Sequence, residues 1–375
     1  MNAIDMLRQA YRDREQAARA AHERGAKVVG YFSNNVPEEL ILAAGLVPVR
    51  LTGDPADTTE LGDRYMEEFC DGPIRSIFDR MLRGHFNFAD LIIIPRTSES
   101  YLQLYYYLLE VRNWEPARSF PEIYLFDLLQ APNWTVGRYD RGRLDALRSR
   151  LDELAGMAMT DDTILKAITT VNENRRLLAR VNALHRRDPP LVSGADMLRI
   201  TATAGFMSKD AHNAALLEIL ADATANELRP GARVMVKGTA HDDDQFYELV
   251  EACGATIVAD DHVTGERAFE HQVAEDGDVM EALTTHYHRH SPSPRSYPQA
   301  EQDKRFLALI DDAHVQGVIF FHDEWDDVHG WDYPVEKKLL DERNIPSTFL
   351  KKQPYRMPDR AAQRATVMGL LRAIR

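Results

Sequence analysis

Short runs of consecutive apolar residues are the feature that most restricts what this chain can fold into. The clearest run is Leu91-Ile92-Ile93-Ile94-Pro95, which no polar residue interrupts. Similar, mostly apolar runs occur near 27–32, 46–51 and 123–126, and again near 233–237, 255–259, 318–321 and 347–350. Strands without polar alternation are buried on both faces, which is typical of parallel sheets covered by helices. Because helical segments separate the runs, the pattern predicts an α/β fold.

The strand-like runs form two groups with a long helical stretch between them. From about 140 to 225 apolar residues recur at helical spacing instead, as in Ile164, Ile168 and Val171. A chain of 375 residues also exceeds the ordinary size of one domain. We therefore predict an N-terminal α/β domain with a leading helix at 1–140, a helical segment at 141–228 and a C-terminal α/β domain at 229–375. Both α/β domains are expected to be Rossmann-like or flavodoxin-like.

The charge balance excludes some classes of partner. The chain has 45 basic and 59 acidic residues, a formal net charge of −14, which argues against nucleic acid and against an anionic membrane surface. Its two cysteines make no disulfide framework and fit a reducing compartment. The sequence contains no signal-peptide pattern and no apolar run of the ~20 residues that a membrane span needs. We expect a soluble, cytoplasmic protein.

Polar segments follow four of the predicted strands, at 33–35, 96–100, 238–244 and 322–330. Ligands of parallel α/β sheets bind beyond the carboxyl ends of the strands, so these segments are candidate site loops.

Cys70 is a further candidate, because it precedes a predicted helix with Pro73 in its first turn. The positive field at a helix N-terminus favours the reactive thiolate. Alternatively, a lone cysteine is a small, buried apolar side chain. Both interpretations stay open on these residues alone.

Several segments resemble, in their order and spacing, a known family. They are Gly30-Tyr31-Phe32-Ser33, Val36-Pro37-Glu38-Glu39-Leu40-Ile41, Cys70 with Arg75-Ser76, Ala89 to Thr97, Gly317-Val318-Ile319 and Gly330-Trp331-Asp332-Tyr333-Pro334. Over nearly its whole length the chain resembles the subunits of 2-hydroxyacyl-CoA dehydratases, such as the D-component of 2-hydroxyglutaryl-CoA dehydratase. The same family includes the benzoyl-CoA reductase subunits that hold the aromatic substrate.

The resemblance implies a CoA thioester as substrate and a [4Fe-4S] cluster bound by three cysteines, one from each of three loops. It also implies a paralogous cluster-bearing subunit as partner, and a separate ATP-dependent iron–sulfur activator that supplies one electron. The three cluster positions correspond to Cys70, Ser98 and Asp326, so oxygen ligands replace two thiols. Since iron–sulfur clusters depend on soft thiolates, this ligand set conflicts with the family cofactor.

Other site residues are predicted on the same loops. Glu38 and Glu39 begin a helix, where either can act as a general base beside the thioester or simply stabilise the positive helix end. Ser33, just before them, is the third predicted catalytic residue. Arg96 and Lys237 lie at strand ends and are predicted to bind CoA phosphates, although ordinary strand-end cations would look the same.

Three histidines alternate at His286, His288 and His290. On a strand they would share one face and could bind a transition metal. Their polar surroundings favour a solvated loop instead.

Three functional hypotheses follow. The first is a subunit of a 2-hydroxyacyl-CoA dehydratase or benzoyl-CoA reductase-type complex that forms the acyl-CoA pocket beside a cluster-bearing partner. The second is a cluster-free protein, either an acyl-CoA-binding homodimer or a non-radical acyl-CoA enzyme. The third is an iron–sulfur subunit with mixed ligation by Cys70, Ser98 and Asp326.

Overall fold

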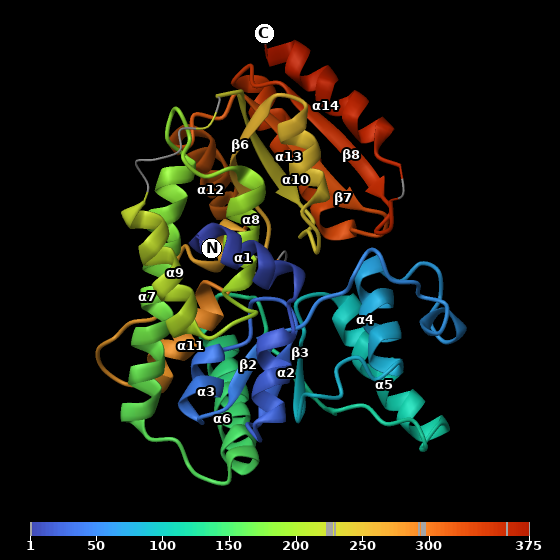
Figure 1. Ribbon diagram of the computed structural model, residues 1–375, viewed down its shortest axis with the longest axis vertical. Coiled ribbons are helices and arrows are strands. Elements are labelled where there is room, and N and C mark those ends of the chain that lie inside the picture. The colour runs from blue at the N-terminus through green and yellow to red at the C-terminus, as the bar shows by residue number, and fades with distance from the viewer. Residues whose placement is uncertain are drawn as a thin grey trace.

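The computed structural model describes residues 2–222, 228, 230–291, 293, 298–357 and 359–374, and these form two four-stranded parallel sheets (Figure 1). The first sheet has the order β2-β1-β3-β4 and consists of β1 (Val28–Tyr31), β2 (Val47–Arg50), β3 (Leu91–Pro95) and β4 (Glu122–Phe126). The second has the order β6-β5-β7-β8 and consists of β5 (Ala232–Gly238), β6 (Ala255–Asp261), β7 (Gly317–Asp323) and β8 (Ser347–Gln353). Both orders follow the flavodoxin-like pattern. The predicted α/β fold with two parallel sheets is confirmed.

Helices cover both sheets and fill the region beside and between them (Figure 1). The first half of the described chain contains α1 (Ala3–Arg12), α2 (Gln16–Glu23), α3 (Glu38–Ala43), α4 (Gly72–Leu82), α5 (Glu99–Trp114) and α6 (Trp134–Ala155). The rest contains α7 (Asp161–His185), α8 (Gly194–Thr203), α9 (Lys209–Ala221), α10 (Gln245–Ala252), α11 (Val279–Arg289), α12 (Gln299–Asp312), α13 (Asp327–Glu342) and α14 (Ala361–Ile374).

Burial on both faces explains why the strands lack polar alternation. In β3, Ile92 and Ile94 pack against α4 and α5, whereas Leu91 and Ile93 pack toward α3, α6 and α7. In the second sheet α10 and α14 cover one face and α12 and α13 cover the other. Each residue of the central strand β3 is therefore buried, whichever way its side chain points.

Part of the later chain packs against the first sheet rather than the second. Val273, Met280 and Leu283 join the core that β1, β3 and α6 form, so α11 lies against the N-terminal sheet domain. The histidine-rich segment belongs to this helix, so the prediction of a loop there is wrong. His286 and Tyr287 are buried in α11, while the Nδ1 atom of His288 hydrogen-bonds the carboxylate of Asp140 at 2.7 Å.

A buried ion pair connects three of these segments. Glu39 of α3 is fully buried, and its carboxylate accepts a hydrogen bond from Arg175 of α7 at 2.7 Å. The hydroxyl of Tyr287 on α11 donates to the other carboxylate oxygen at 2.7 Å. Removal of one partner would leave the other as a buried charge without compensation, so breaking such a pair strongly destabilises the fold.

We expect Glu39→Ala to lower the free energy of unfolding by about 3–5 kcal/mol, because Arg175 would stay buried without its carboxylate. Urea denaturation measures this. The matched control is Glu122→Ala, which removes a 52%-exposed carboxylate that also pairs with an arginine, Arg150, and should cost under about 1 kcal/mol. Equal losses in the two variants would contradict a structural role for the Glu39 pair.

Candidate functional site

The carboxyl ends of the two sheets face one common cavity of about 330 Å³. In each sheet the strand order reverses between the first and third strands, β1 and β3 or β5 and β7, and ligands of such sheets bind at this switch point. The cavity is lined by Ser33 after β1, 97–101 after β3, residues from 238 to 242 after β5, and residues from 323 to 329 after β7. The four loops predicted from the sequence therefore come together.

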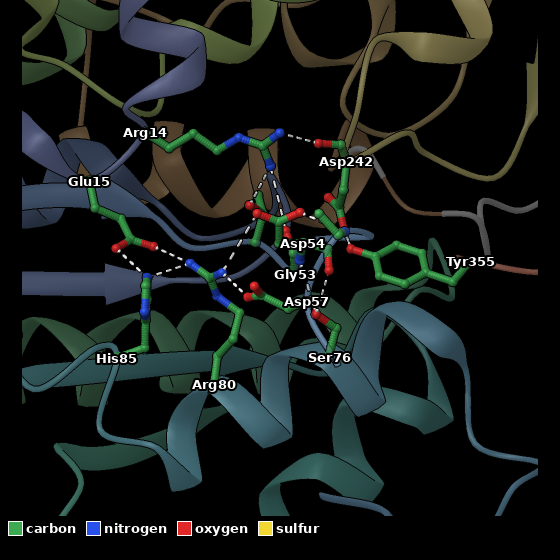
Figure 2. A network of polar contacts seen from close by, with 12 residues as sticks. Arg14, Glu15, Gly53, Asp54, Asp57, Ser76, Arg80, His85, Asp242 and Tyr355 are labelled. Atoms are coloured by element: carbon green, nitrogen blue, oxygen red, sulfur yellow. Dashed lines mark hydrogen bonds and ion pairs between the residues drawn. The ribbon is translucent and has the colours of Figure 1, made fainter. Parts of the chain in front are cut away.

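Contacts across the cavity rim hold the two sheets in this position, and Figure 2 shows them in detail. Arg14, between α1 and α2, donates to the hydroxyl of Thr52 at 2.8 Å and to the backbone carbonyl of Asp242 in the second sheet domain. The hydroxyl of Tyr355, which follows β8, donates to the carboxylate of Asp242 at 2.7 Å. Asp242 is thus hydrogen-bonded both to a residue of the first half of the chain and to a residue of the second half.

Tyr355 also packs directly on two glycines of the first half. A Cβ atom on Gly53 would lie 2.5 Å from the Tyr355 hydroxyl, and one on Gly72 would lie 2.3 Å from the Tyr355 Cβ. Only glycine leaves room for so close an approach. Below this contact Arg80 pairs with Glu15 at 2.8 Å and Asp57 at 2.6 Å, which ties the loop after β2 to α2 and α4 (Figure 2).

The cavity has an apolar wall, formed mainly by the loop after β2 and the start of α4. Leu51, Ile74 and Ile77 are at most 3% exposed and belong to the core that includes β3 and α5. Tyr101 of α5 and Val328 of α13 extend this wall. Because its members are part of a packed core, the wall is a rigid apolar surface.

Carboxyl groups line the opposite side, and Asp323 is the most unusual of them. It is the last residue of β7, and its backbone N–H donates to the Thr239 hydroxyl at 3.0 Å. Removal from water raises the pKa of Asp323 well above its ordinary value, and the charges of Asp326 and Asp71 raise it further. A carboxyl group kept neutral in this way can donate a proton, as a general acid does.

Asp326, three residues further on, has the opposite character. Its carboxylate caps α13 by accepting from the backbone of His329 at 3.1 Å, and it also bonds the His329 ring at 2.7 Å and the Thr239 hydroxyl. Burial opposes ionisation of Asp326, but His329 and these hydrogen bonds outweigh burial and lower its pKa. The pKa values of these two neighbouring aspartates are thus shifted in opposite directions, that of Asp323 upward and that of Asp326 downward.

Arg50, the last residue of β2, is a buried cation in the cavity wall. It is 4% exposed, and it donates to the Asn34 side-chain oxygen at 2.9 Å and the Ala202 carbonyl at 3.2 Å. Among the described residues, no carboxylate forms an ion pair with Arg50, and its Nε has no hydrogen-bond partner. Burial lowers the pKa of this arginine. The hydroxyl of Thr97, also in the wall, is buried and unpartnered as well.

Four of the residues predicted from the sequence lie at or beside the cavity. Ser33, Ser98 and Asp326 line it, and Ser33 adopts a left-handed backbone conformation with φ of 60°, which is uncommon outside glycine. Cys70 is 3% exposed and borders a second cavity of about 360 Å³, which shares Asp323 and Trp325 with the first. Burial, with Glu67 and Asp71 nearby, raises the pKa of the Cys70 thiol. Of the two alternatives for Cys70, the raised pKa and the burial favour the small, buried apolar side chain over the thiolate.

The other four predicted residues are not among those that line this cavity. Glu39 is buried as described, and Glu38 pairs with Lys209 at 2.9 Å. Lys237 is buried between Asp261, at 2.5 Å, and Glu336, at 3.1 Å. Arg96 lies 3.6 Å from Glu99 and 3.5 Å from Asp127. The catalytic and phosphate-binding roles of these residues stay predictions.

The donors present do not fit a [4Fe-4S] cluster. Cys70 offers one buried thiol, whose sulfur lies 3.9 Å from the Gln103 side-chain oxygen, and Asp326 already bonds Thr239 and His329. Ser98 supplies a hydroxyl, which is a poor substitute for a thiolate. In the described part of the chain, no group of three or more histidine, cysteine, aspartate or glutamate side chains is arranged to hold a metal ion.

Asp242 and Asp323 lie in loops that the sequence predicted as site loops, although neither was predicted as a catalytic or substrate-binding residue, and Arg50 was missed. Asp323 and Arg50 each end a buried strand, at the edge where ligands bind, so their positions were a usable signal. The partners that give them unusual charge states come from distant parts of the chain.

A two-sheet α/β fold with a cavity at its switch points has the arrangement in which α/β proteins commonly bind ligands. Residues 33–365 match the model of the family described as 2-hydroxyglutaryl-CoA dehydratase, D-component, and the chain belongs to this family. The resemblance noted in the sequence is confirmed.

Curated relatives are similar over most of their length. The chain is 28% identical to one of the benzoyl-CoA reductase subunits of Thauera aromatica, over 87% of this chain and 85% of that protein. It is 22% identical to the (R)-phenyllactyl-CoA dehydratase beta subunit of Clostridium sporogenes, over 88% and 87%. It is 25% identical to the beta subunit of (R)-2-hydroxyglutaryl-CoA dehydratase of Acidaminococcus fermentans, over 86% of each. In the described residues, every helix is too short or too polar to cross a bilayer.

The raised pKa of Asp323 predicts a pH-dependent stability. The folded state holds the Asp323 proton more tightly than the unfolded state, so this stabilisation is complete at low pH and is lost as pH rises through the folded-state pKa. Asparagine mimics the neutral acid, so the stability of Asp323→Asn relative to the unaltered protein should increase from pH 5 to pH 8. Urea denaturation at both pH values measures it, with Asp341→Asn on exposed α13 surface as control. A constant or falling difference would show that Asp323 is ionised in the folded protein.

Proposed function

We propose that this chain is a subunit of a 2-hydroxyacyl-CoA dehydratase or benzoyl-CoA reductase-type complex, and that the cavity between its sheets binds the acyl end of a CoA thioester. The observation that carries the proposal is the cavity at both switch points in a chain of this family. A volume of about 330 Å³ lies in the range of small-molecule sites, which are largely apolar with a few polar groups.

The polar groups are suited to an oxygen-bearing acyl group. Arg50 and the Thr97 hydroxyl can donate to a carbonyl oxygen, because both are buried and incompletely hydrogen-bonded. Asp323 can deliver a proton to a departing or developing oxygen. Ser33 lines the same cavity and remains a proposed catalytic residue.

Electron transfer is assigned in this proposal to a partner. Relatives bear the names of subunits, which supports a multi-subunit complex. Because the donors at Cys70, Ser98 and Asp326 do not fit a cluster, a paralogous chain would hold it, and an ATP-dependent iron–sulfur activator would reduce that partner. Anaerobic co-purification with a paralogue that has all three cysteines, followed by iron and sulfide analysis of each chain, tests this division. Iron bound to this chain alone would overturn it.

One observation favours a second candidate, a cluster-free acyl-CoA protein. The pKa of Asp323 is raised and that of Asp326 beside it is lowered, which is an arrangement that suits acid–base chemistry without a radical step. Aerobic purification of a colourless homodimer that turns over a CoA thioester would establish this candidate against the first.

Blocking the cavity should abolish thioester binding. Ala240 lines the cavity, and Ala240→Trp would fill much of it. We expect at least a tenfold higher Kd for benzoyl-CoA by isothermal titration calorimetry, since the acyl group loses its place. Ala365→Trp, at an exposed position of α14, is the control for adding the same side chain elsewhere. Unchanged binding by a folded Ala240→Trp protein would place the acyl site outside this cavity.

A further inference from the structure

We propose that the cavity selects CoA thioesters with an uncharged, apolar acyl group and rejects acyl groups that end in a second carboxylate. The inference rests on the proposed function and specifies its substrate class. It comes from the charges and surfaces that line the cavity, because the relatives act, by their names, on both kinds of acyl group.

The apolar wall offers a surface for the acyl chain. Leu51, Ile74 and Ile77 are held by the core behind them, so the wall cannot withdraw to let water reach a charged group. Burying a carboxylate against such a surface without a compensating partner is costly, whereas burying an aromatic ring or a branched alkyl chain is favourable.

Other parts of the lining repel negative charge. Asp71, Asp242 and Asp326 line the cavity, and so does Glu99 at the start of α5. Burial, with the charges of Asp326, Asp71 and Asp242, raises the pKa of Asp323, so this environment disfavours a further anion. A substrate carboxylate in the same space would meet the same desolvation and the same charges.

Arg50 is not placed to bind a substrate carboxylate and so to offset this repulsion. Of the described residues that line the cavity, it alone is an arginine or lysine. Its Nη1 and Nη2 already donate to the neutral oxygens of Asn34 and Ala202, and its guanidinium lies over the Phe206 ring, 5.0 Å from the centroid. A carboxylate is bound best by two parallel, free N–H groups of an arginine. The remaining donors suit one carbonyl oxygen, such as that of a thioester.

The decisive experiment measures the Kd of the full-length chain for three probes: benzoyl-CoA, isovaleryl-CoA and glutaryl-CoA. We expect glutaryl-CoA to bind at least tenfold more weakly than both uncharged thioesters. Glutaryl-CoA binding within threefold of benzoyl-CoA, or tighter, would overturn the selectivity and leave the proposed function standing. If none of the three binds, the proposed function itself fails, and this inference fails with it.

Removing charge from the acidic wall should relax the selectivity. Asp326→Asn keeps a side chain that can cap α13, and it should lower the glutaryl-to-benzoyl Kd ratio at least threefold. Asp341→Asn on the exposed face of the same helix, where Asp341 pairs with Lys337, should leave the ratio unchanged. Should Asp326→Asn fail to fold, Glu99→Gln at a 55%-exposed side chain is expected to shift the ratio in the same direction. An unchanged ratio in the folded wall variant would overturn the electrostatic explanation.

Discussion

The hydrogen bonds of Asp242 determine how the two sheets face each other. Its backbone carbonyl accepts from Arg14 in the first half of the chain, and its carboxylate accepts from Tyr355 beyond β8. Tyr355 in turn rests on Gly53 and Gly72, where no larger side chain fits. Because these contacts join the loops after β2, β5 and β8, they bring the two carboxyl edges to one cavity. Everything proposed about ligand binding depends on this closed arrangement.

The structure distinguishes two kinds of charged residue that look alike in the sequence: those in buried ion pairs and those that line the cavity. Lys237 and Glu39 are buried and compensated by ion pairs, so their charges serve the packing of the fold. Arg50 and Asp323 line the cavity, and in the described part of the chain neither forms an ion pair. Ionisable groups without a charged partner are destabilising when they are removed from water, and such groups cluster at functional sites.

The position predicted for the third cluster ligand illustrates how a family site can change. Asp326 lies where a thiolate is expected, but it caps α13 and bonds His329. Its negative charge then helps to raise the pKa of Asp323. At a position where the family resemblance implies a metal ligand, this chain has a carboxylate that acts on a neighbouring acid, and we propose that the chain binds substrate while another carries electrons. This division of labour is the proposal, and the charge pair is the structural feature behind it.

By itself the sequence determined the strands, the two-sheet class, the family and the four loops of the site. These follow from local properties: apolar runs without alternation, helical spacing, and the rule that ligands bind at the carboxyl ends of parallel strands. Tertiary structure alone decided that α11 packs on the first sheet, that Glu39 meets Arg175, and that the pKa of Asp323 is raised. Burial and charge interactions depend on residues far apart in the chain, and no local pattern encodes which of them become neighbours.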